Sequence, residues 1–170
     1  MKTAFGPLDG FKDTMAGALA TWFGAGLSPK APGTAGSLAA LPFVLGVLSF
    51  NSETVVAMVS LALLLIGVWS GGIVGRLWGQ VDHGAIVIDE VLGQLIAIAI
   101  PFFALVGWVD SIWLFSVGFV LFRIFDVLKP WPVDWLDRNL KNPLGVMLDD
   151  VSAGVCAGVT SIPLLALTLV

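Results

Sequence analysis

Long apolar runs alternate with short polar segments over most of the chain. Three of these runs, Thr54–Val74, Val91–Val109 and Val151–Val170, have about the 20 residues that a membrane-crossing helix needs. Leu38–Phe50 and Ser111–Phe122 are shorter, and we interpret them as two further membrane segments. None of these segments contains a charged residue. The pattern therefore predicts about five membrane segments.

Backbone polar groups within lipid must be hydrogen-bonded inside the protein, so these segments are expected to be helices. The predicted fold class is all-α, a polytopic membrane helical bundle. Thr14–Leu27 is apolar but too short to span, and it predicts a short N-terminal interfacial or re-entrant helix. Gly24–Ser37 is rich in Gly and Pro, which disfavour regular helix. This segment is expected to be a loop whose backbone amides are available to a ligand.

The composition supports a membrane location. The chain is 58% hydrophobic and 12% charged, whereas about 25% of residues are charged in soluble domains. Its mean hydropathy is +0.99. Its length suits a single domain covering residues 1–170. The net charge of −4 provides no basic surface, so membrane lipids are expected as partners and nucleic acid is not.

The basic residues predict the orientation of the bundle. Between the predicted spans, every Lys and Arg falls in the segments of one side, which the positive-inside rule makes cytoplasmic. These residues are Lys2, Lys12, Lys30, Arg76, Arg123, Lys129, Arg138 and Lys141. The N-terminus is then inside and the C-terminus outside. The polar clusters, and with them the expected active site, lie at the cytoplasmic face.

Two acidic pairs stand at the start of predicted spans: Asp89 with Glu90, and Asp149 with Asp150. One interpretation is helix capping, because acidic groups at a helix N-terminus are stabilised by the macrodipole by about 0.3–1 kcal/mol. Two pairs at one depth, with Asp126 near them, instead favour a Mg²⁺ site built from carboxylate oxygens. The candidate metal ligands are Asp89, Glu90, Asp126, Asp149 and Asp150.

The remaining charged positions suggest how a phosphate would be handled. His83 is the only histidine, and it is either a general acid or base or a hydrogen-bonded loop residue. Arg123 and Asp126 are three residues apart, share one helix face and are expected to pair. Arg123, Lys129 and Lys30 together would make a phosphate clamp. The alternative for these cations is that they extend toward lipid headgroups.

The chain resembles a known family, phosphatidylglycerophosphatase A. The resemblance rests on four segments, Gly24–Pro42, His83–Gly93, Phe122–Pro132 and Gly145–Gly154, and on their order and spacing. It implies an all-helical, Mg²⁺-dependent enzyme of the bacterial inner membrane, with its active site facing the cytoplasm. It also implies that the substrate is phosphatidylglycerophosphate, whose phosphomonoester is hydrolysed to give phosphatidylglycerol and phosphate.

The matching positions carry the expected site residues. Carried over from the family, they are Lys30, His83, Asp89, Glu90, Arg123, Asp126, Lys129, Asp149 and Asp150. Of these, His83, Asp89 and Asp150 are the candidates for catalytic residues, and Lys30, Arg123 and Lys129 for substrate binding. In one route water attacks the phosphate, with His83 moving the proton. In the competing route a carboxylate such as Asp89 attacks and forms an acyl-phosphate.

Two other classes of function remain open. A membrane transporter or channel with a cytoplasmic cation-binding site would usually place ionisable groups inside its spans. The predicted spans are free of charge, which argues against that class. In a structural or assembly factor, the acidic pairs would only cap helices. The sequence does not indicate the oligomeric state.

Overall fold

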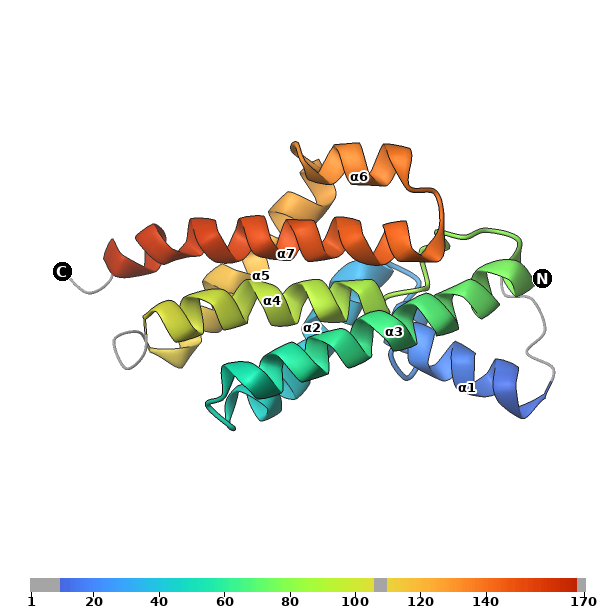
Figure 1. The fold of residues 1–170 in the computed structure, drawn as a ribbon, viewed down its shortest axis with the longest axis horizontal. Helices are drawn as coiled ribbons and strands as arrows, with labels where there is room; N and C mark the ends of the chain where they lie inside the picture. The colour runs from blue at the N-terminus through green and yellow to red at the C-terminus, as the bar shows by residue number, and fades with distance from the viewer. Residues whose placement is uncertain (1–9, 106–109, 168–170) are drawn as a thin grey trace.

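The computed structural model describes residues 10–105 and 110–167, and these residues are almost entirely helical (Figure 1). The elements, in chain order, are α1 (Phe11–Ala20), the 3-10 helix η1 (Ala25–Leu27), α2 (Pro32–Leu48), α3 (Glu53–Trp78), α4 (Ile88–Ala104), α5 (Ser111–Leu128), α6 (Val133–Asn139) and α7 (Pro143–Ala166). Within the described residues there is no strand, which confirms the prediction of an all-α fold.

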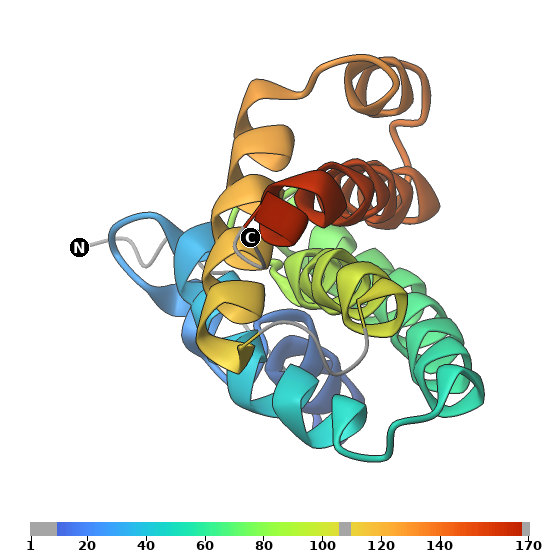
Figure 2. The same ribbon diagram turned by 90° about the vertical axis from the view of Figure 1, so that its left-hand side faces the viewer.

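Helix α4 is the centre of the bundle. It packs most extensively against α7 and also touches α2, α3 and α5, as the end-on view in Figure 2 shows. Its apolar side chains are therefore buried on several faces, among them Val91, Leu92 and Leu95. Gly154 of α7 lies directly on the backbone of Gly93 in α4, where any Cβ would overlap the Gly93 carbonyl oxygen. This close approach brings the polar starts of the two helices together.

Three helices, α3, α5 and α7, are long and apolar enough to cross a membrane. Helix α2 is apolar but shorter, with 17 residues, and α4 also has 17 residues. Large apolar side chains such as Leu65 of α3 and Ile112 of α5 are exposed at 62% and 73%. Exposure of this extent suits helices whose outer faces meet lipid rather than water.

The prediction of a non-helical segment over Gly24–Ser37 was wrong for most of its length. Residues 25–27 form η1, and α2 already begins at Pro32. Proline is well tolerated in the first turn of a helix, because the N–H that it lacks has no partner inside the helix anyway. Only the short connection that ends at Ala31, which has a left-handed backbone with φ 48°, is irregular. The helix expected over Thr14–Leu27 also has different bounds in the structure: α1 begins at Phe11 and ends at Ala20.

The boundaries of the last span were also wrong. Helix α7 begins at Pro143, well before the expected start at Val151, because the Asn142 side chain caps it by accepting a hydrogen bond of 2.9 Å from the Gly145 amide. Helix α5 likewise continues past Phe122 to Leu128. Both helices therefore contain charged residues, and the argument that charge-free spans exclude a transporter does not hold. Residues 106–109 and 168–170 of the predicted spans lie outside the described residues.

Candidate active site

The first acidic pair lies in the first turn of α4, as the sequence predicted. The helix begins at Ile88 after Val87, whose amide donates a hydrogen bond of 2.8 Å to the carbonyl of Ala20 in α1. Asp89 accepts a hydrogen bond of 3.0 Å from the amide of Glu90. Asp89 thus has part of a capping role, in agreement with the macrodipole argument. That role does not account for the burial of its carboxylate.

The second acidic pair does not cap a helix. Asp149 and Asp150 lie about two turns inside α7, where the amides of the first turn are already far away. Both side chains are buried, with exposed fractions of 6% and 4%. Unpaired charges are costly to bury, so carboxylates in this position need cations near them. The expectation that this pair opens a span was wrong, and helix capping does not explain its presence.

Three carboxylates from the two pairs come together. One oxygen each of Asp89, Glu90 and Asp150 lies within 4.8 Å of the others, and we call these three residues the carboxylate cluster. The Glu90 Oε2 atom is buried and has no hydrogen-bond partner among the described residues. Such a set of hard oxygen donors fits a divalent cation, since Mg²⁺ binds through few carboxylates together with water and substrate phosphate.

The two other predicted metal ligands face cations instead. Asp126 of α5 forms an ion pair of 2.7 Å with Arg123 Nη1, which confirms the predicted pairing. Asp126 still lies close enough to Asp150 for their charges to interact. Asp149 forms an ion pair of 2.8 Å with Lys129. These two acids therefore surround the carboxylate cluster rather than belonging to it.

Arg123 lies where α5, α2 and α4 meet. Its Nη1 donates a hydrogen bond of 3.3 Å to Ser37 Oγ of α2, and its Nε is buried with no partner among the described residues. Gly33, in the first turn of α2, rests on the same guanidinium and on Glu90. A Cβ at position 33 would overlap Glu90 Oε1 and lie 3.2 Å from Arg123 Nη2. No local pattern in the sequence indicated these roles for Gly33 and Ser37.

Lys129 binds two carboxylates outside this centre. Its Nζ lies 2.8 Å from both Asp137 of α6 and Asp149 of α7, and Lys141 approaches Asp137 at 3.4 Å. We call these four residues the lysine cluster. Burial disfavours the charge of Lys129, but its hydrogen bonds to Asp137 and Asp149 outweigh that effect and raise its pKa. The hydrogen bond from Lys129 lowers the pKa of Asp137.

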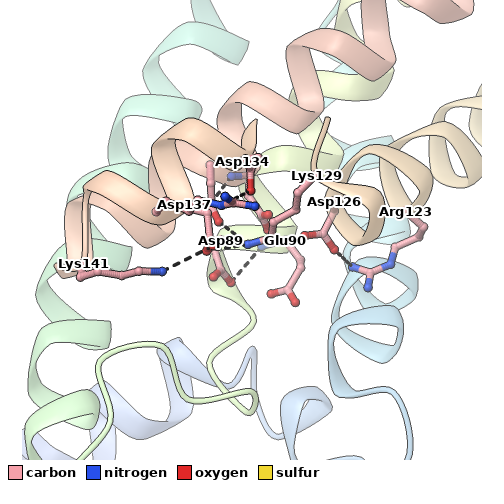
Figure 3. Close-up of polar contacts among 11 residues, drawn as sticks. Asp89, Glu90, Arg123, Asp126, Lys129, Asp134, Asp137 and Lys141 are labelled. Carbon is pink, nitrogen blue, oxygen red and sulfur yellow. Dashed lines mark hydrogen bonds and ion pairs between the residues drawn. The ribbon is translucent and has the colours of Figure 1, made fainter. Parts of the chain in front are cut away.

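The arrangement of these groups is visible in Figure 3. Asp89 and Glu90 lie in the middle, with the Arg123–Asp126 pair on one side and Lys141 on the other. Two members of the predicted phosphate clamp, Arg123 and Lys129, thus approach the carboxylates from the end of α5. The third member, Lys30, is exposed in the connection before α2.

His83 lies in the loop before α4 rather than among the close carboxylates. Its ring packs edge-on against Trp78 at a centroid distance of 4.8 Å, and its Nδ1 accepts a hydrogen bond of 3.2 Å from the Ala85 amide. An Nδ1 that accepts a hydrogen bond leaves Nε2 as the protonated nitrogen of the neutral ring. The ring is half-buried.

Comparison with known proteins shows that the sequence is similar to those of a described family. The family model for phosphatidylglycerophosphatase A matches residues 18–165. Phosphatidylglycerophosphatase A of Escherichia coli (strain K12) is 43% identical over 138 residues, which cover 81% of this chain and 76% of the relative. The protein of the same name from Haemophilus influenzae is 38% identical over 140 residues, covering 82% of each chain.

A third relative has a different name. A Bacteroides thetaiotaomicron protein, provisionally named as a phosphatidylinositol-3-phosphatase, is 36% identical over 141 residues, with 81% of this chain and 85% of the relative covered. No solved structure matches this chain. The family model spans all the helices that contribute to the carboxylate and lysine clusters. The chain therefore belongs to the phosphatidylglycerophosphatase A family.

Proposed function

We propose that this protein hydrolyses the phosphomonoester of phosphatidylglycerophosphate, releasing phosphate and leaving phosphatidylglycerol for phospholipid biosynthesis. The observation that carries the proposal is the carboxylate cluster beside Arg123, in a chain that belongs to a family of lipid phosphatases. Buried acids next to a guanidinium are the groups needed to bind a phosphate together with a divalent cation.

Mg²⁺ is the proposed cofactor, held by Asp89, Glu90 and Asp150. The fit rests on the close approach of their oxygens and on the buried, unpartnered Glu90 Oε2. When bound, Mg²⁺ supplies charge neutralisation at the phosphate and lowers the pKa of a coordinated water. Asp126 holds Arg123 beside this centre by its ion pair, and Asp149, next to Asp150 in the chain, pairs with Lys129.

Arg123 is the proposed principal contact for the phosphate oxygens. Its Nη1 is held by Asp126 and Ser37, which fixes the plane of the guanidinium, while its Nε is buried without a partner among the described residues. Positioning of this kind dominates catalysis of phosphoryl transfer. Lys129 adds positive charge beside Asp149, and Lys30 adds it from the exposed connection before α2.

For the chemical step we propose direct attack by water, with His83 removing a proton from the water or protonating the leaving glycerol oxygen. The competing route is attack by Asp89, which would form an acyl-phosphate. A rapidly quenched single turnover with a substrate ³²P-labelled in its phosphomonoester distinguishes them, since direct attack forms no phosphorylated protein. Recovery of a phosphorylated Asp would establish the competing route.

We also propose the finer topology: five membrane segments, with the site at the cytoplasmic face of the bacterial inner membrane. The support is the positive-inside distribution and the placement of both clusters at one end of α4 and α7. A reporter fused after Val170 is expected outside, and reporters at Arg76 or Lys141 in the cytoplasm. A cytoplasmic reporter signal after Val170 would contradict the five-segment topology.

The function itself is tested by phosphate release from purified protein in detergent micelles. The assay compares phosphatidylglycerophosphate with a phosphatidylinositol phosphate, each with Mg²⁺ and after chelation. We expect release from phosphatidylglycerophosphate that stops on chelation and returns with added Mg²⁺. Absence of phosphate release from either lipid would favour a transporter or an assembly factor instead. Release that persists after chelation would remove Mg²⁺ from the proposal but not the phosphatase activity.

A further inference from the structure

Helices α2 and α5 meet at the site and then separate. Helix α2 begins at the site and runs away from it, whereas α5 runs toward the site and ends beside it. The hydrogen bond of 3.3 Å between Arg123 and Ser37 joins their polar ends. Elsewhere the two helices touch only over a short stretch, so a seam opens between them.

An apolar groove of about 370 Å³ occupies this seam. Its lining comes only from α2 and the first part of α5, and consists of Leu41, Pro42, Leu45, Ser111, Ile112 and Phe115. Its outer edges are open, with Leu45 exposed at 57% and Ile112 at 73%. In a bilayer such a groove is in contact with hydrocarbon, so it is shaped for an alkyl chain rather than for a polar ligand.

The groove lining and the polar contact share a face of each helix. On α2, Leu41 and Leu45 follow Ser37 at intervals of four residues, and on α5, Phe115 precedes Arg123 by eight. Residues four apart lie on the same face of a helix. The seam thus has charged groups at one end, and its groove is lined by uncharged residues, all of them apolar except Ser111.

The length of the seam suits one leaflet of a membrane. From Ser37 to Leu45 the rise is about 12 Å, at about 1.5 Å per residue. One leaflet of hydrocarbon is about 15 Å thick, half of the core of about 30 Å. A lipid with its phosphate beside Arg123 therefore has room for an acyl chain along the seam, without bending around a helix.

A second apolar groove has a different lining. It has a volume of about 430 Å³ and lies between the α1 region, α2, α3 and the start of α4, with Trp22, Phe43, Ile66 and Ile88 among its lining residues. No residue of α5 or α7, the helices that carry Arg123, Asp126 and Asp150, lines it. Its one residue of α4 is Ile88, which precedes Asp89.

We propose that the groove between α2 and α5 binds one acyl chain of the lipid whose phosphate is held by Arg123 and the carboxylate cluster. This inference rests on the proposed function, and it assigns to the apolar part of the substrate a site separate from the charged part. Binding there orients the lipid, so that the phosphomonoester enters between α2 and α5.

The test compares a long-chain lipid substrate with its deacylated, water-soluble headgroup. Leu45→Trp and Ile112→Trp fill the groove from positions whose side chains are mostly exposed, so the core is spared. Both variants are expected to lower kcat/KM for long-chain phosphatidylglycerophosphate at least tenfold and to leave turnover of the headgroup within twofold. The matched control is Leu61→Trp on α3, which is exposed at 57% but lies far from the seam in sequence.

The two proposals fail in different ways. Equal losses on both substrates for Leu45→Trp, or an equal loss in Leu61→Trp, would overturn the acyl-chain site. The phosphate site fails instead if Arg123→Ala leaves turnover of the headgroup unchanged. If wild type elutes as a dimer and Leu45→Trp as a monomer, the groove is a contact between two copies, and the acyl-chain site is wrong.

A measurement on the wild-type protein does not depend on variants that insert correctly. Phosphatidylglycerol with a diazirine on one acyl chain is photolysed with the protein in micelles, and the labelled peptides are identified by mass spectrometry. Label concentrated in the peptides of α2 and α5 is expected. Excess phosphatidylglycerol without the diazirine should remove it. Label spread evenly over α3, α5 and α7, or not reduced by this competitor, would show only general lipid contact and overturn the proposal.

Discussion

The carboxylate cluster and the lysine cluster are neighbours on α7, yet only one of them has its charges balanced by the protein. In the lysine cluster, Lys129 and Lys141 face the carboxylates of Asp137 and Asp149. In the carboxylate cluster, Asp89, Glu90 and Asp150 lie together, and Glu90 Oε2 has no partner among the described residues. The consecutive residues Asp149 and Asp150 of α7 thus differ in their neighbours: Asp149 faces a lysine, and Asp150 faces two other acids.

The difference separates structural charge from functional charge. Partly buried ion pairs hold elements together, and here those of Lys129 join the end of α5 to α6 and α7. Acids left close together without a cation store unfavourable energy, which a bound metal or substrate relieves. We therefore expect substitutions in the carboxylate cluster to affect rate, and those of Asp137 and Lys141 in the lysine cluster to affect mainly stability.

The largest effect is expected for Asp150→Asn. Loss of a ligand charge removes several kcal/mol of transition-state stabilisation, and each 1.36 kcal/mol is tenfold, so kcat should fall by at least about 10³-fold. The neighbouring change Asp149→Asn is the control and should cost much less, since Asp149 contacts Lys129. Phosphate release and yield of purified protein are measured for both. Equal losses would remove the distinction between the clusters.

A second effect concerns His83, which lies outside both clusters. His83→Ala should lower kcat by about 10²-fold, the lower end of the range for general acid–base catalysis. Phosphate release by wild type and variant is measured at saturating substrate. A loss below tenfold would make His83 a loop residue that binds the Ala85 amide.

Gly33→Ala tests how closely the carboxylate cluster is packed. The added methyl group overlaps Glu90 Oε1 and approaches Arg123, so both charged groups must move. Because displacements of about 1 Å can cost 10²-fold in rate, kcat/KM should fall by about 10- to 10²-fold. Thermal stability should change little, since Ala favours helix by about 1 kcal/mol over Gly. Normal activity would show that Glu90 and Arg123 need no fixed position.

The smallest effect on rate is expected for Asp137→Asn in the lysine cluster. It removes the ion pair between Asp137 and Lys129, which is partly exposed and contributes about 1 kcal/mol to the free energy of unfolding. Because this pair lies outside the carboxylate cluster, kcat should stay within threefold. The folded-state pKa of Asp137 is lowered, so its contribution is present above the unfolded pKa of about 3.9 and is lost as pH falls through the folded value. Denaturation of both proteins at pH 7 and at lower pH should show the difference shrinking with acid.

Much of this molecule follows from its apolar pattern, because charged residues are conspicuous in so hydrophobic a chain. The helix α3, the first part of α5, the position of Asp89 and Glu90 at the start of α4, and the Arg123–Asp126 pairing were predicted from local sequence. The start of α7 was not, although Asn142 and Pro143 mark it locally, because Asp149 and Asp150 were expected to open the span, whereas Asp149 is buried inside the helix against Lys129, twenty residues away in the chain. Ser37 and Gly33 were missed because their roles come from Arg123, and the Ser37 contact spans 86 residues.

The position of Asp149 and Asp150 inside α7 has a consequence for biogenesis. An acidic residue in a helix entering the bilayer opposes its insertion, by about 2.5–3.5 kcal/mol at the centre and less near an end. Helix α7 follows α4, α5 and α6 in the chain, so Lys129 and the other helices of the site are synthesised before it. We expect α7 to enter the membrane alongside these partners rather than alone. An isolated fragment with only α7 should therefore insert less efficiently than α7 does behind α4–α6, and Asp149→Leu in the fragment should reduce that difference.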